Sequence, residues 1–254
     1  MKVVILCGGK GTRLNEETEF RPKPLVKIGD MPILWHIMKI YSYYGFNDFI
    51  LCLGYRGEMI KEFFVNFSWM GQDFILELSS SKKTLLPSNS LPNWKITFVD
   101  TGQETNTGGR IKKIEKYIGE DTFMATYGDG VSNINIKSLL EFHKEKGRIA
   151  TLTAIHPPSQ FGIIEEKDGI AASFKEKPML DGLINGGFFV FNKKIFSYLS
   201  FDSILEEEPL RELAKEKELS VYVHSGFWMC MDTFKQAQTL NNIWKEGKGL
   251  WKVW

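Results

Sequence analysis

Apolar residues in the first half of the chain form two kinds of segment that alternate with each other. Short runs rich in Val, Ile and Phe predict strands, whereas apolar residues repeated every three or four positions predict amphipathic helices. The polar stretch 79–93 predicts a long loop. Regular alternation of this kind favours a largely parallel sheet with helices on both faces. The predicted strands cover 3–7, 49–53, 74–78, 95–99 and 123–127, and the predicted helices cover 32–44, 59–67, 109–118 and 136–146.

The second half of the chain is richer in strands and has fewer long helices. Asp168-Gly169 marks a tight hairpin between two of these strands. We expect the central sheet to continue through both halves, which makes residues 1–254 a single α/β domain with a mixed, mainly parallel sheet. The predicted strands here cover 150–155, 162–166, 170–174, 187–191 and 219–224, and the predicted helices cover 193–199, 209–218 and 233–245.

The composition is ordinary for a globular protein and narrows the choice of partners. The 254 residues are 43% hydrophobic and 25% charged with a formal net charge of +1, so no basic excess points to nucleic acid. The opening apolar run is shorter than a signal peptide requires. No stretch approaches the roughly 20 apolar residues of a membrane-spanning helix. Cys7, Cys52 and Cys230 form no Cys-x-x-Cys pair, which favours a reducing, cytoplasmic compartment.

A glycine-rich turn follows the first predicted strand directly. Residues 8–13, Gly-Gly-Lys-Gly-Thr-Arg, combine three glycines with two cationic side chains. Glycines let backbone N–H groups approach a ligand, and successive N–H groups in a turn form a concave anion site. The turn is therefore a candidate phosphate site, although a loop that only reverses the chain has the same composition. It is neither a P-loop, because Gly11 follows Lys10, nor a dinucleotide fingerprint, because Leu14 replaces the third glycine.

A second segment strengthens the phosphate interpretation. Lys23 lies between Pro22 and Pro24. Each proline fixes its own φ and restricts the residue before it, so the lysine stands on a stiff backbone. Such a frame suits an ammonium group that is aimed at a phosphate.

Two aspartates are candidates for a metal site. Asp129 lies between two glycines after a predicted buried strand, where open α/β sheets bind ligands. Asp232 is the only charge in the apolar run 226–233. Mg²⁺ takes one or two carboxylates and completes its coordination with water and substrate phosphates. The alternatives are an Asp-Gly turn at Asp129 and a helix N-cap at Asp232.

Three further segments carry polar groups into apolar surroundings, each with a turn or a cap as its alternative interpretation. In Glu176-Lys177-Pro178 a proline stiffens a lysine, and Asn185-Gly186 offers an amide to a hydroxyl-rich ligand. Residues 107–110, Thr-Gly-Gly-Arg, repeat the combination of glycines and a cation at a predicted helix start. The four histidines show no metal-ligand spacing.

Residues 6–14 together with 21–24 resemble the signature of the sugar-phosphate nucleotidyltransferases. The similarity runs from end to end of the chain. Cys7 stands where the family usually has alanine, and Gln160 stands where arginine is common. Within the family, the chain is similar to members that act on CTP and glucose 1-phosphate in residues 32–38, 99–102, 107–110, 127–130, 184–189, 226–228, 231–233 and 251–252.

The resemblance implies a Rossmann-like nucleotidyltransferase fold with a small β-rich sugar-binding extension. It implies a nucleotide-binding half at 1–148 and a sugar-phosphate-binding half at 149–254. The implied reaction transfers a cytidylyl group from CTP to α-D-glucose 1-phosphate and gives CDP-glucose and pyrophosphate, for bacterial surface polysaccharide such as O-antigen. Mg²⁺ is the implied cofactor, and the implied assembly is a homo-oligomer, a trimer or a hexamer. Positioning and charge neutralisation supply the catalysis in such a reaction.

The resemblance also assigns roles to residues. Arg13, Lys23 and Asp129 are the catalytic candidates, and Asp129 and Asp232 are the candidate metal ligands. Lys177 is expected to hold the sugar phosphate, and Glu176 and Asn185 the sugar hydroxyls. The other substrate-binding candidates are Leu6, Gly8, Gly9, Lys10, Gly11, Thr12, Thr107, Arg110, Gly128 and Gly186.

Other functions stay open on the sequence alone. A nucleotidyltransferase for another sugar 1-phosphate, or for dTTP or UTP, is an alternative, because no residue in the sequence reads the base. A metal-dependent glycosyltransferase is expected to carry an Asp-x-Asp pair, and Asp129 stands alone between glycines. A non-catalytic nucleotide-sugar-binding protein does not need Lys23, Asp129 and Asp232 together.

Overall fold

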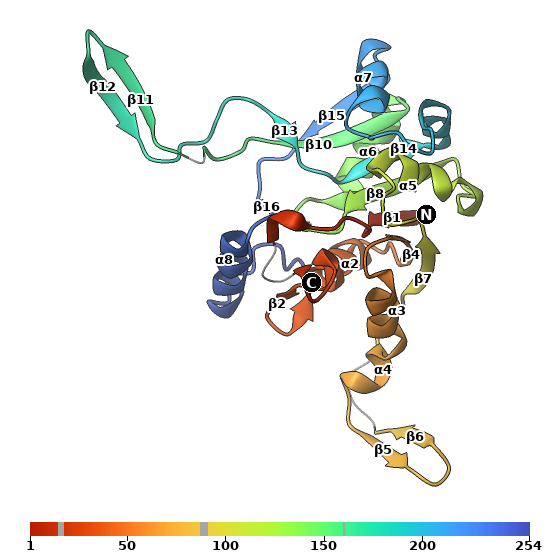
Figure 1. Cartoon of the computed structure of the whole chain (residues 1–254). Coiled ribbons are helices and arrows are strands. Elements are labelled where there is room, and N and C mark those ends of the chain that lie inside the picture. Colours follow the sequence, from red (N-terminus) through yellow and green to blue (C-terminus); the bar gives the residue numbers. More distant parts are fainter. Residues whose placement is uncertain (15–17, 87–90, 160) are drawn as a thin grey trace.

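The central sheet runs through both halves of the chain and contains eight strands of the described residues (Figure 1). The computed structural model describes residues 1–14, 18–86, 91–159 and 161–254, without the side chain of Arg13. β1 (Lys2–Leu6) pairs in parallel with β4 (Asp48–Leu53) and with β8 (Thr122–Tyr127). β7 (Lys95–Asp100) extends the parallel part beyond β4.

The strands of the second half join the same sheet next to β8. β14 (Phe189–Asn192) pairs antiparallel with β8 and with β10 (Ala150–Ile155). β10 also pairs antiparallel with the short β13 (Ile184–Asn185) and parallel with β15 (Leu219–Val223). The prediction of one mixed, mainly parallel sheet is therefore confirmed. The division of function between 1–148 and 149–254 stays a prediction.

Alternate residues of the central strands face two different hydrophobic clusters. Val3 and Ile5 belong to one cluster and Val4 to the other, as the two-residue period of a strand requires. α2 (Ile33–Tyr43) and α8 (Phe234–Lys245) contribute to the first cluster. The second takes residues from α5 (Thr107–Lys113) and α7 (Glu208–Lys215). Strands buried on both faces explain why the sequence shows continuous apolar runs there.

Several predicted helices differ from the observed ones in detail. The predicted helix 59–67 is α3 (Gly57–Val65) followed by the short α4 (Phe67–Met70). The predicted helix 109–118 is α5 followed by the 3₁₀ helix η3 (Glu115–Tyr117). The predicted helix 193–199 is the 3₁₀ helix η4 (Lys193–Tyr198). The described residues also contain the helices α6 (Ile136–Lys146), η1 (Thr12–Leu14) and η2 (Lys23–Leu25). None of the described helices combines the length and hydropathy of a membrane span.

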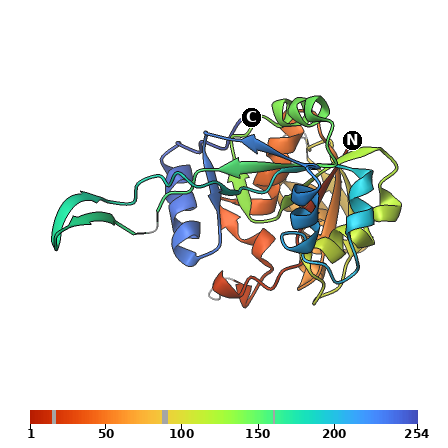
Figure 2. The same ribbon diagram turned by 90° about the horizontal axis from the view of Figure 1, so that it is seen from above.

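Two β-hairpins project from the body of the protein (Figure 1). The longer projection, which we call the arm, contains β11 (Ile163–Lys167) and β12 (Ile170–Lys175), and Figure 2 shows it from above. The arm turns at Asp168-Gly169, where both residues have positive φ, as the hairpin prediction requires. The other hairpin contains β5 (Phe74–Glu77) and β6 (Lys82–Leu85).

The prediction of a loop throughout 79–93 is wrong at β6. This strand reads Lys-Lys-Thr-Leu and is exposed along its length, so its sequence carries no apolar alternation. The rest of that prediction includes residues 87–90, which lie outside the described residues, as does Gln160.

Two short ladders were not predicted from the sequence. β2 (Lys27–Ile28) pairs with β3 (Met31–Pro32), and β9 (Gly130–Ser132) pairs with β16 (Trp228–Cys230). Strands of two or three residues are too short for a period to be visible. The β9–β16 ladder sets Cys230 opposite Gly130 and brings the segment before α8 to the carboxyl end of β8.

Candidate active site

The glycine-rich turn and the Asp129 loop leave the sheet side by side. β1 and β8 are parallel with Leu6 opposite Tyr127, so their carboxyl ends meet at the same edge of the sheet. The N–H of Gly128 donates to the carbonyl of Leu6 at 3.0 Å. A Cβ at Gly128 would lie 2.8 Å from that carbonyl oxygen. Glycine is therefore required at this position.

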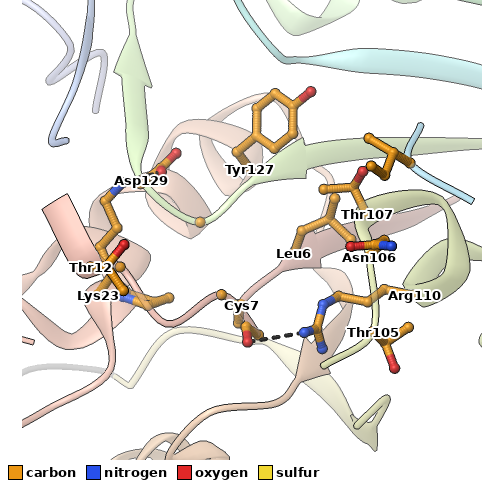
Figure 3. A pocket seen from close by; sticks show the side chains of 16 residues that line it. Leu6, Cys7, Thr12, Lys23, Thr105, Asn106, Thr107, Arg110, Tyr127 and Asp129 are labelled. Carbon is orange, nitrogen blue, oxygen red and sulfur yellow. Dashed lines mark hydrogen bonds and ion pairs between the residues drawn. The ribbon is translucent and has the colours of Figure 1, made fainter. Parts of the chain in front are cut away.

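Two pockets open at this edge. The first pocket has a volume of about 410 Å³ and is lined by the glycine turn, Lys23, Arg110 and residues 105–107. Lys23 and Asp129 lie at one end of it and Arg110 at the other (Figure 3). The second pocket has a volume of about 220 Å³. It shares Tyr127 and Asp129 with the first and is also lined by Asn185, Gly186, Trp228, Cys230 and Asp232.

Lys23 bridges the two aspartates that the sequence proposes as metal ligands. Its Nζ lies 2.6 Å from Oδ2 of Asp129 and 2.5 Å from Oδ1 of Asp232. Met231 N–H donates to the carbonyl of Asp129 at 2.8 Å, which continues the β9–β16 ladder to the site. Both carboxylates therefore face one common point.

Asp232 does not cap the helix that follows it. Thr233 is the N-cap of α8 and forms a capping box with Gln236. The side chain of Gln236 also accepts from the backbone N–H of Asp232 at 2.8 Å. Because Thr233 caps the helix start, the Asp232 carboxylate is not the cap and contacts Lys23 instead.

The charges of this cluster fit a divalent cation. Burial on its own lowers the pKa of Lys23, but the carboxylates of Asp129 and Asp232 outweigh it, and the pKa is raised. Within the described residues, no group of three or more His, Cys, Asp or Glu side chains gathers into a metal site. Two carboxylates that face one point are what Mg²⁺ takes from a protein when phosphates supply its other ligands.

The buried side chain of Arg110 holds the glycine turn through hydrogen bonds to backbone carbonyls. Its side chain is only 4% exposed. One guanidinium nitrogen donates to the carbonyls of Leu53 and Gly102 and to Oγ1 of Thr101, and the other donates to the carbonyls of Gly8 and Gln103, at 2.7–3.2 Å. Burial lowers the pKa of Arg110 from its usual range. A Cβ at Gly8 would collide with this guanidinium, at 2.0 Å from its nearest nitrogen.

A sequence model described as nucleotidyl transferase matches residues 2–238. The chain belongs to the nucleotidyl transferase family. It is 52% identical to a probable glucose-1-phosphate cytidylyltransferase of Bacillus subtilis (strain 168), over the full length of both chains. It is 46% identical, again over both full lengths, to the glucose-1-phosphate cytidylyltransferase of Salmonella typhimurium (strain LT2). The structure of an apo UDP-glucose pyrophosphorylase shares the fold, with a TM-score of 0.70, 17% identity and coverage of 97% of this chain and 98% of that one.

Most of the predicted site residues of this nucleotidyl transferase line one of the two pockets. The first pocket takes those from Leu6 to Thr12 except Lys10, together with Lys23, Thr107, Arg110, Gly128 and Asp129. The second takes Asn185, Gly186 and Asp232. Lys10 pairs with Glu104 at 2.6 Å. The side chain of Arg13 lies outside the described residues, so its assigned role stays a prediction.

Glu176 and Lys177 line neither pocket in the described part of this nucleotidyl transferase. They follow β12 on the return from the arm, where their side chains are 61% and 53% exposed and lie 3.4 Å from each other. The carboxylate of Glu176 lies next to Gly162, on the other branch of the arm. Their predicted contacts with the sugar phosphate stay a prediction.

The structure adds three residues that the sequence interpretation left out. Tyr127 lines both pockets, and the Trp228 Nε1–H donates to the carbonyl of Gly186 at 2.6 Å. Glu206 accepts hydrogen bonds from two residues that line the pockets. Tyr127 could have been identified from the sequence, because it lies at a strand end close to Asp129. Glu206 belongs to the acidic run 206–208, which gives no such signal.

Proposed function

We propose that this nucleotidyl transferase transfers the cytidylyl group of CTP to α-D-glucose 1-phosphate and releases CDP-glucose and pyrophosphate. The observation that carries the proposal is the junction of the two pockets, where Lys23 contacts both Asp129 and Asp232. Two adjoining pockets suit two substrates that must meet at one phosphorus atom. The two relatives that match over their full length support CTP and glucose 1-phosphate as the pair.

In the proposed reaction, the first pocket takes the triphosphate and the second takes the sugar. The N–H groups of the glycine turn face the phosphates, and Arg110 holds the turn in place. A phosphate oxygen of glucose 1-phosphate attacks the α-phosphorus of CTP. The bond from that phosphorus to the bridging oxygen breaks, and its electron pair leaves with pyrophosphate. The phosphate oxygen is already anionic, so the protein does not need to remove a proton.

The charged side chains balance the negative charge that gathers during this step. Asp129 and Asp232 are the residues that would hold Mg²⁺ at the junction, and bound Mg²⁺ supplies positive charge to the phosphates. The Lys23 side chain is 12% exposed and contacts both carboxylates, and it carries its proton because its pKa is raised. Its ammonium can therefore contact the α-phosphate on the side of the first pocket.

A grid of pyrophosphate-release assays tests the substrate pair directly. Each of CTP, UTP, dTTP, ATP and GTP is combined with each of several sugar 1-phosphates in the presence of Mg²⁺. We expect CTP with glucose 1-phosphate to give the highest kcat/KM. A higher kcat/KM with dTTP or UTP would contradict the choice of base.

We also propose that the protein acts in the cytoplasm as a homo-oligomer in which the arm packs against a second copy. The arm exposes large apolar side chains, including Phe161 at 76%, Ile170 at 73% and Phe174 at 61%. Exposed apolar side chains gathered on a projecting hairpin are typical of an interface. Sedimentation should give a mass of several chains for the wild type and a smaller mass for Phe174→Asp. A monomeric wild type would contradict the proposal.

A further inference from the structure

Glu206 joins the walls of the two pockets, although it contacts neither of the aspartates nor Lys23 in the described structure. It lies just before α7, and each of its carboxylate oxygens accepts one hydrogen bond. The hydroxyl of Tyr127 donates to Oε1 at 2.5 Å, and the hydroxyl of Thr107 donates to Oε2 at 2.6 Å. Thr107 lines the first pocket and Tyr127 lines both.

The chain of hydrogen bonds continues from Tyr127 into the second pocket. Nδ2 of Asn185 donates to the hydroxyl oxygen of Tyr127 at 3.0 Å. Oδ1 of Asn185 accepts from the backbone N–H of Gly187 at 2.9 Å. The amide of Asn185 is thus held at both of its ends.

The direction of the two bonds at the Tyr127 hydroxyl follows from the carboxylate of Glu206, whereas the Gly187 N–H by itself requires Oδ1 of Asn185 as its acceptor. A carboxylate oxygen can only accept, so the Tyr127 hydroxyl must donate its single proton to the hydrogen bond with Glu206. Burial and the Glu206 charge raise the pKa of Tyr127, which keeps that proton in place. The Tyr127 oxygen can then only accept from Asn185, so it holds the same amide orientation that the Gly187 N–H requires. One N–H and one lone pair of the amide remain for a ligand in the second pocket.

We propose that Glu206 is a positioning residue that holds the Nδ2 end of Asn185 in place through the Tyr127 hydroxyl, and so sets the affinity of the second pocket for glucose 1-phosphate. The inference rests on the proposed function, because it takes the second pocket as the sugar site. It gives a role to a residue of an acidic run that is not among those lining either pocket. Glu207, the next residue, has no side-chain cap bond on α7 and is the matched control.

Three variants test the proposal through the separate KM values of the two substrates. Glu206→Ala should raise the KM for glucose 1-phosphate at least about tenfold, which is the effect of about 1.4 kcal/mol, while the KM for CTP changes less. Glu206→Gln should stay within about threefold of the wild type for the sugar KM, because its amide oxygen still accepts from Tyr127. Glu207→Ala should match the wild type for both substrates.

The Tyr127→Phe background separates positioning from general damage to the fold. Without the Tyr127 hydroxyl, Glu206 has no path to Asn185. Tyr127→Phe should therefore raise the sugar KM by itself, and adding Glu206→Ala should raise it no further. Equal effects of Glu206→Ala in both backgrounds, a sugar KM for Glu206→Gln as high as for Glu206→Ala, or an unchanged sugar KM in Glu206→Ala would each overturn the inference. An inactive wild type would instead overturn the proposed function.

Discussion

Lys23 and Asp232 are 209 positions apart in the chain, yet Nζ of the lysine lies 2.5 Å from Oδ1 of the aspartate. The β9–β16 ladder makes this contact by folding the segment before α8 onto the end of β8. The lysine also contacts Asp129 at 2.6 Å, so a single ammonium neutralises part of the charge of two carboxylates. A divalent cation held by the same two carboxylates must compete with that ammonium for their oxygens.

Replacing Lys23 with methionine should therefore strengthen metal binding in the absence of substrates. We expect Lys23→Met to bind Mn²⁺, a paramagnetic substitute for Mg²⁺, at least about tenfold more tightly, because the variant removes a positive charge that contacts both carboxylates and competes with the cation for their oxygens. Electron paramagnetic resonance titration measures the free Mn²⁺ directly. Lys27→Met removes an exposed lysine nearby and should leave the affinity unchanged. Unchanged or weaker binding in Lys23→Met would contradict the competition.

Turnover should depend on both carboxylates. Asp129→Asn and Asp232→Asn should each lower kcat by at least about a hundredfold, which is the usual effect of losing one preorganised electrostatic group. The shape of the side chain is conserved, so circular dichroism should show a wild-type fold. Asp73→Asn, at an exposed position before β5, is the matched control with normal kcat. Near-normal turnover in either site variant would show that its aspartate is not a ligand of the proposed metal.

Arg110 should matter for stability as well as for the site. Its guanidinium donates to four backbone carbonyls and one hydroxyl, and Arg110→Met would remove all of these hydrogen bonds at once. The Leu53 and Gly8 carbonyls would keep the backbone N–H groups of Thr101 and Tyr55 as donors. We expect the free energy of unfolding to fall by about 3 kcal/mol, measured by urea denaturation. Arg148→Met is the control, because that arginine is half exposed and contacts Glu218 at 3.6 Å. If the free energy of unfolding fell no more for Arg110→Met than for Arg148→Met, the hydrogen bonds of Arg110 would contribute little to stability.

His36 should make the stability depend on pH. It is fully buried among Trp244, Trp251 and Trp254, and burial lowers its pKa to about 4. In the unfolded chain, His36 takes up a proton near pH 6.5, whereas in the folded protein it stays neutral down to about pH 4. The free energy of unfolding is therefore highest above pH 6.5 and falls as the pH is lowered toward 4. The loss should be about 1–3 kcal/mol.

Thermal denaturation at pH 7 and pH 4.5 checks this dependence on His36. His36→Gln cannot be protonated, so the difference in stability between wild type and variant should shrink at the lower pH. The same difference at both pH values would show that another group controls the acid lability.

The sequence predicts the central sheet well because its strands are buried on both faces, and their apolar runs stand out. It does not predict β9 and β16, since three residues carry no visible period. Lys23, Asp129 and Asp232 are identified individually from proline, glycine and apolar context. Their mutual contact depends on the β9–β16 pairing, and local patterns cannot supply such a long-range contact.

The positions of other site residues cannot be predicted from local sequence patterns. Glycines at a helix start and a following cation suggest a phosphate contact at Arg110, but they do not say which side of the glycine turn the guanidinium occupies. The structure places it on the backbone carbonyls. In the sequence, Glu206 is one of three consecutive glutamates, which predicts a solvated carboxylate. Only the fold of the loop before α7 shows that it accepts hydrogen bonds from Thr107 and Tyr127.

The pairing of β8 with β14 limits how the enzyme can open and close. Four residues of each strand are in register across the boundary between the two halves of the chain, from Phe189 opposite Ala125 to Asn192 opposite Thr122. A hinge between the halves would have to break this hydrogen-bonded ladder. Entry of substrates and release of products therefore require movement of segments outside this ladder.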